Sequence, residues 1–190
     1  MNTQHPFTWL SASAQKWAFL ITLILTLAVL AALQVLGRPL NTAAAPASIV
    51  SFELAGDLAT AREILDSWGP FGQVYAGLNL GLDYLFLLLY PTAIGLGCVL
   101  VAGELTNRLT GLAKAGVLLA WVLYLAATLD AVENFAMIKV LLGSGNPIWP
   151  PVARWCALPK FAIVILGLLY VLVGVLLILV VKTVQLVRDQ

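Results

Sequence analysis

Long apolar runs constrain this sequence more than any other feature. The clearest run extends without a charged residue from Phe161 to Val181 and stops at Lys182. A helix needs about 20 such residues to cross the ~30 Å hydrocarbon core of a bilayer. A soluble domain carries roughly 25% charged residues, whereas this chain has 10% charged and 62% hydrophobic residues. The sequence therefore predicts an integral membrane protein with a single domain.

Three further apolar runs lead us to expect an all-α bundle of four transmembrane helices. The predicted spans cover residues 17–36, 75–103, 111–142 and 159–182. Gly37-Arg38-Pro39 follows the first run, and Gly143 is placed to terminate the third helix. A cleaved signal peptide within the first 45 residues is an alternative, but the first apolar run exceeds the usual core of about 7–15 residues.

The loop between the first two spans is predicted to hold two short elements. Apolar residues alternate with polar ones over residues 50–54, which indicates an extended segment. From Leu58 to Trp68, apolar residues recur every three or four positions, with charged residues on other faces. This second stretch is too short and too charged to span. We expect residues 58–68 to form an amphipathic helix that lies on the membrane or on the bundle.

Several kinds of chemistry lack the residues that they need. Cys98 and Cys156 are the only cysteines and form no Cys-x-x-Cys pair, and His5 is the only histidine. A thiolate or histidine metal centre is therefore disfavoured, and we expect neither a cofactor nor a metal. The net charge is +1 without a Lys/Arg run, which disfavours a nucleic-acid partner. Membrane lipids are the expected partners, together with other membrane proteins or a second copy of the chain.

The orientation follows from the charges outside the spans. Four crossings place both termini on one side. Lys and Arg divide equally between the two sides, but most of the acidic residues fall opposite the termini. The side with the termini therefore keeps the larger unpaired positive charge, which is typical of the cytoplasmic side. We expect a plasma or inner membrane protein with both termini in the cytoplasm.

Two aspartates interrupt the predicted spans at matching depths. Asp83 lies about seven residues inside the second span, or roughly 10 Å below its start. Asp130 lies some fifteen residues, or ~22 Å, from the start of the apolar part of the third span. Because these two helices run antiparallel, both carboxylates are predicted to lie in the leaflet opposite the termini.

Other polar residues share faces with these aspartates. Glu133 and Asn134 follow Asp130 at three and four residues, which places all three on one helix face. An ionisable side chain facing lipid costs ~2.5–3.5 kcal/mol, so these groups are expected to face the bundle interior and to pair with Lys160. The candidate site consists of Asn79, Asp83, Tyr84, Tyr90, Asp130, Glu133, Asn134 and Lys160. A purely structural charge network at the same place remains the alternative.

Three functions are compatible with this pattern. The first is a non-catalytic accessory, assembly or scaffold component of the membrane. The second is a membrane-embedded enzyme acting on a lipid or isoprenoid-like substrate, with Asp83, Asp130 and Glu133 as the candidate catalytic groups. The third is a protomer of a proton- or cation-coupled transporter or channel.

Overall fold

The computed structural model describes residues 4–188, and all regular secondary structure in that range is helical. Within it, four helices are long and apolar enough to cross a membrane. They are α1 (Ala12–Gly37), α3 (Leu58–Leu105), α4 (Thr110–Leu141) and α5 (Trp149–Arg188). Two short helices, η1 (Arg38–Leu40) and α2 (Ile49–Glu53), lie between α1 and α3. The expectation of an all-helical chain with four helices of this kind is confirmed.

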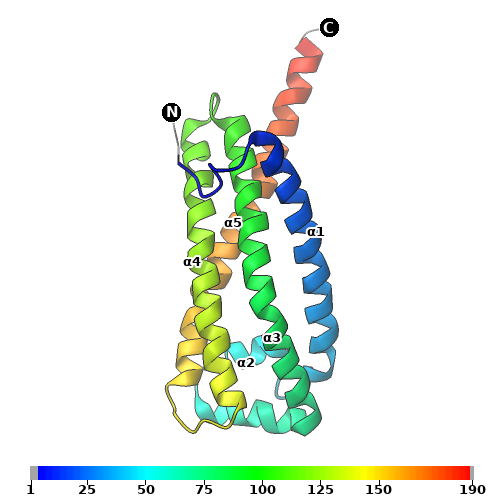
Figure 1. Ribbon diagram of the computed structural model, residues 1–190, viewed down its shortest axis with the longest axis vertical. Helices are drawn as coiled ribbons and strands as arrows, with labels where there is room; N and C mark the ends of the chain where they lie inside the picture. Colours follow the sequence, from blue (N-terminus) through cyan, green and yellow to red (C-terminus); the bar gives the residue numbers. More distant parts are fainter. Residues whose placement is uncertain (1–3, 189–190) are drawn as a thin grey trace.

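The long helices run side by side, with α3 at the centre. It packs against α1, α4 and α5, and α4 also packs against α5 (Figure 1). The beginning of α1 and the end of α5 lie at one end of the bundle, which we call the terminal end. The α4–α5 connection, α2 and the first turns of α3 lie at the other end, which we call the loop end.

The outer faces of the long helices are strongly apolar. In α1 the buried residues are Thr26, Leu33 and Gly37, while bulky residues such as Ile24 and Leu27 are exposed. The apolar stretch of α5 is similarly exposed along most of its length. Small residues allow the inner faces to approach closely, as where Gly167 lies against Ile94 and Leu123.

The alternating pattern over residues 50–54 led us to expect an extended segment, but Ile49–Glu53 instead form the helix α2. The helical turn directs both Phe52 and Glu53 inward, where both are buried. Phe52 meets the edge of the Trp68 ring at a centroid distance of 5.4 Å. These tertiary contacts outweigh the weak preference of five residues for an extended conformation. The expectation of an extended segment was therefore wrong.

The first part of α3 crosses the loop end of the bundle before the helix turns along it (Figure 1). Asp57 caps its start by accepting a hydrogen bond from the Thr60 amide at 2.9 Å. The turn occurs at Gly69, which has φ 60° and ψ −177°, a conformation open essentially only to glycine. The Trp68 indole then donates to the Leu40 carbonyl at 2.7 Å and fixes the crossing segment to η1.

The α4–α5 connection combines an expected feature with an unexpected one. Gly143 has a φ of 85°, and the amide of Ser144 donates to the Lys139 carbonyl at 3.0 Å, which is the Schellman pattern at a helix end. Helix α5 begins at Trp149, ten positions before the expected start of the fourth span. Pro150 and Pro151 fall in its first turn, where the missing amide hydrogen costs no helical bond.

Candidate functional site

The candidate site centres on Lys160 of α5, which is 6% exposed. Its ammonium group donates to Oδ1 of Asp130 at 3.0 Å and to Oε1 of Glu133 at 2.8 Å. A third carboxylate, that of Glu53 in α2, lies 3.7 Å away, at ion-pair distance but beyond a hydrogen bond. One cation therefore connects three helices.

Helix α4 contributes its groups through helical spacing. Asp130, Glu133 and Asn134 lie on one face and are all at least 97% buried. The Asn134 amide turns toward α3 and donates to Oδ2 of Asp83 at 2.6 Å. The structure thus brings Asp83, Asp130, Glu133, Asn134 and Lys160 into one region, as an ion-pair group around Lys160 and an adjoining Asn134–Asp83 pair. We call these five residues and Glu53 the Lys160 cluster.

Two apolar layers enclose the Lys160 cluster. The loop-end layer contains Leu40, Phe52, Ile64, Trp68, Leu80 and Met137, and the terminal-end layer contains Phe7, Leu96, Leu105, Leu123 and Tyr170. On α4 the first layer begins at Ala136 and the second stops at Leu123, so Asp130 and Glu133 lie between them. Such surroundings have a low dielectric constant, which strengthens each ion pair and makes any unpaired charge costly.

Negative groups outnumber the cation in the cluster. Glu53, Asp83, Asp130 and Glu133 surround one lysine, and Oε2 of Glu53 and Oε2 of Glu133 are buried without a hydrogen-bond partner. Burial raises the pKa of Glu53 above its ordinary value of 4.5, although the Lys160 charge opposes that shift. Since a buried excess of charge is unfavourable, binding a proton at a carboxyl group lowers the free energy of the cluster.

Three residues expected in the site lie at or beyond its margin. Asn79 donates to the Leu33 carbonyl at 2.9 Å and thereby ties α3 to α1 rather than to Lys160. Tyr84 is 36% exposed on the outer surface, with its hydroxyl 3.4 Å from the Ala131 carbonyl. Tyr90 is buried, but its hydroxyl has no hydrogen-bond partner among the described residues.

Glu53 belongs to the Lys160 cluster, and the sequence did not identify it. The alternating pattern placed Glu53 with Ser51 on a polar face of an extended segment. A carboxylate between Phe52 and Leu54, in a loop expected to cover the polar leaflet, was the available signal. Only the helical form of α2 turns Phe52 and Glu53 inward together.

The side chains of the cluster differ sharply in their exposure. Glu133, Asp130 and Lys160 are 0%, 3% and 6% exposed, so a substrate cannot touch them without opening the bundle. Asp83 is half-buried and is the member that lies nearest to the outer surface. In the described part of the chain, no group of three or more His, Cys, Asp or Glu side chains is arranged to hold a metal ion.

Comparisons with protein-family models, curated proteins and solved structures were made for the whole chain. No family model, curated protein or solved structure matches it.

Proposed function

We propose that this chain is a small membrane-embedded accessory, assembly or scaffold component, in which the Lys160 cluster fastens the bundle internally. One observation carries the proposal: the Lys160 ammonium is buried and already surrounded by carboxylates from α2 and α4. A buried ammonium group that makes two hydrogen bonds and a third ion pair is suited to fixing helix register. It is poorly suited to proton exchange with a substrate.

The surface supports insertion into a membrane. Large apolar side chains such as Leu20, Leu125 and Leu172 are exposed on different helices. Their exposure is unfavourable in water but favourable in the hydrocarbon core of a membrane. At the terminal end, the described side chains of Lys16, Arg108, Lys114 and Lys182 outnumber the single described carboxylate, Glu104. That excess supports a cytoplasmic location for this end, in a plasma or inner membrane.

The crossing segment of α3, residues 58–68, is proposed to lie in the opposite interface. Ala61, Ile64, Leu65 and Trp68 are buried against the bundle, whereas Arg62, Glu63 and Asp66 are exposed. Such a helix meets polar headgroups with its charged face and covers the Lys160 cluster with its apolar face. In this arrangement, the segment and α2 together cover the charged residues of the Lys160 cluster on the side of that interface.

A second candidate is an enzyme acting on a lipid or isoprenoid-like substrate, and the position of Asp83 favours it. This carboxylate has one hydrogen-bonded oxygen, lies in a half-buried position and has the exposed Tyr84 beside it. A polar group of a membrane-soluble molecule can reach it from the side. Asp83 can then act as a base while Asn134 orients it.

Deletion of the gene distinguishes the two functions. If the chain is an accessory component, its loss lowers the amount of specific membrane proteins, and both the wild type and Asp83→Asn restore them. If it is an enzyme, its loss changes the membrane lipid profile, and Asp83→Asn fails to reverse that change. Quantitative proteomics and lipid mass spectrometry on the same membranes measure both outcomes. A restored proteome with Asp83→Asn supports the proposal, and an uncorrected lipid profile overturns it.

A further inference from the structure

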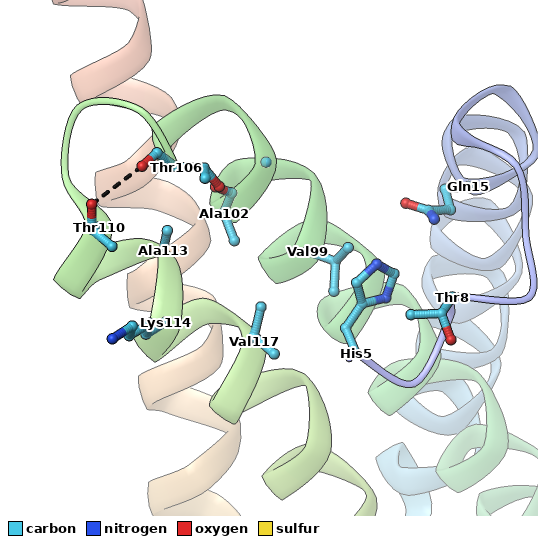
Figure 2. Close-up of a pocket in the computed structure, with 11 residues that line it drawn as sticks. His5, Thr8, Gln15, Val99, Ala102, Thr106, Thr110, Ala113, Lys114 and Val117 are labelled. Carbon is cyan, nitrogen blue, oxygen red and sulfur yellow. Dashed lines mark hydrogen bonds between the residues drawn. The ribbon is translucent and has the colours of Figure 1, made fainter. Parts of the chain in front are cut away.

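A cavity of about 390 Å³ lies at the terminal end, far from the Lys160 cluster. The last turns of α3 and the first turns of α4 form two of its sides (Figure 2). Its third side is the segment before α1, residues 4–11, which we call the N-terminal strap. The volume falls within the range of about 300–1,000 Å³ typical of ligand pockets.

The N-terminal strap is fixed in place by contacts on both of its flanks. Phe7 is 3% exposed and lies against Gly95, where an added Cβ would meet its ring at 3.4 Å. The Trp121 indole donates to the Gln4 carbonyl at 3.2 Å. Gln15 of α1 donates to the carbonyls of Phe7 and Leu10 at 3.3 and 3.1 Å. The cavity wall is therefore a defined part of the fold.

The polar groups that remain available around the cavity favour an anion. The His5 Nδ1 atom accepts from the Phe7 amide at 3.2 Å, which leaves Nε2 to carry the hydrogen of the neutral ring. Thr8 lines the cavity from the same strap, and Lys114 lies across the cavity on α4, with its ammonium group directed away from the strap (Figure 2). No carboxylate lines the cavity, and nearby Glu104 is paired with Lys182 at 3.7 Å.

Gln15, Thr106 and Thr110 also line the cavity, but their donor groups are used in hydrogen bonds to backbone carbonyls. The floor of the cavity is apolar, and its position is interfacial. Val99, Ala102 and Val117 form the floor between α3 and α4 (Figure 2). Trp9 and Trp17, which are 77% and 65% exposed, lie at the same end, as aromatic residues do at the headgroup level of a membrane. Basic pockets between helices at such a level bind anionic headgroups. A ligand with both a phosphate and an apolar part matches this combination.

We propose that the cavity beneath the N-terminal strap binds the headgroup of an anionic phospholipid. The phosphate lies in the mouth between α4 and the strap. The flexible Lys114 side chain turns toward it from α4, His5 and Thr8 donate to it from the strap, and the glycerol region rests on the valine and alanine floor. The inference depends on the membrane insertion proposed above. It concerns a different site from the Lys160 cluster, so neither the accessory nor the enzymatic function is needed for it.

Native mass spectrometry of the protein in a neutral detergent tests the site. The probes are phosphatidylglycerol, phosphatidylcholine and soluble glycerol 3-phosphate. We expect phosphatidylglycerol to bind more tightly than both other probes. Lys114→Gln is expected to weaken phosphatidylglycerol binding about fivefold, as for loss of one lysine near an anionic surface. Thr8→Val is expected to weaken it as well, and Lys16→Gln, a cation at the same end that does not line the cavity, is expected to leave it unchanged.

Each other outcome overturns the assignment. Equal binding of the two phospholipids excludes anion recognition, and equal losses in Lys114→Gln and Lys16→Gln indicate general charge attraction. Equal binding of glycerol 3-phosphate and phosphatidylglycerol assigns the cavity to a soluble phosphate ester. Thermal midpoints without lipid verify that the variants fold. Resistance of the wild type to carbonate extraction measures membrane insertion separately, so failure there is distinguishable from failure of the cavity assignment.

Discussion

Lys160 determines the electrostatics of the bundle at the scale of single residues. With the lysine removed, the carboxylates that face it lose their counter-charge in a low-dielectric layer. We expect Lys160→Met to cost about 3–5 kcal/mol, the usual penalty for breaking a buried pair. The double variant Lys160→Met/Asp130→Asn is expected to be more stable than Lys160→Met alone, because one of the uncompensated charges is gone. Thermal unfolding in detergent measures both, with Asp130→Asn as the matched single variant. Strictly additive losses would contradict the pairing.

Glu53 is expected to make stability depend on pH. Burial raises its pKa in the folded protein above the ordinary value of 4.5, so the folded state retains a proton that the unfolded chain has released. This contribution to stability is fully present below pH 4.5 and is lost as the pH rises through the folded pKa. Glu53→Gln, which resembles the protonated form, is expected to lose less stability than the wild type as the pH rises above 4.5. Glu63→Gln on the exposed face of α3 is the control, and identical pH profiles for Glu53→Gln and wild type would refute the effect.

The turn within α3 depends on one glycine, which is the central point at the scale of elements. Nothing lies within 4 Å of a Cβ added to Gly69, so a substitution there tests the backbone conformation alone. We expect Gly69→Ala to cost about 1–3 kcal/mol and to loosen the crossing segment. Gly81→Ala is the matched control, because that glycine is helical and equally open, and the change is expected to be neutral or stabilising by about 0.5–1 kcal/mol. Equal effects of the two substitutions, measured as unfolding free energies, would show that the Gly69 conformation is not needed.

Which elements the sequence predicts depends on how many residues carry the signal. The four long helices follow from apolar runs, and the shared face of Asp130, Glu133 and Asn134 follows from helical spacing. The α2 helix was missed because five residues carry too little local preference, and its conformation is set by the contacts of Phe52 with Trp68 and of Glu53 with Lys160. Asn79 was assigned to the site by spacing alone, which cannot reveal that a carbonyl of α1 is within its reach.

At the scale of the whole molecule, α4 and α5 run antiparallel, so the α4–α5 connection and the end of α5 lie at opposite ends (Figure 1). With its 40 residues, α5 extends about 60 Å at ~1.5 Å per residue, which exceeds the ~30 Å hydrocarbon core.

If α5 crosses the membrane, a reporter inserted at Ser144 and one fused after Gln190, which lies outside the described residues, occupy different compartments. A third reporter at Asn107, in the α3–α4 turn at the terminal end, is expected to agree with the fusion at Gln190. From the excess of lysine and arginine at that end, we expect both in the cytoplasm. Alkaline phosphatase activity and green fluorescence measure the two sides, and the same compartment at Ser144 and Gln190 would exclude the four-span topology.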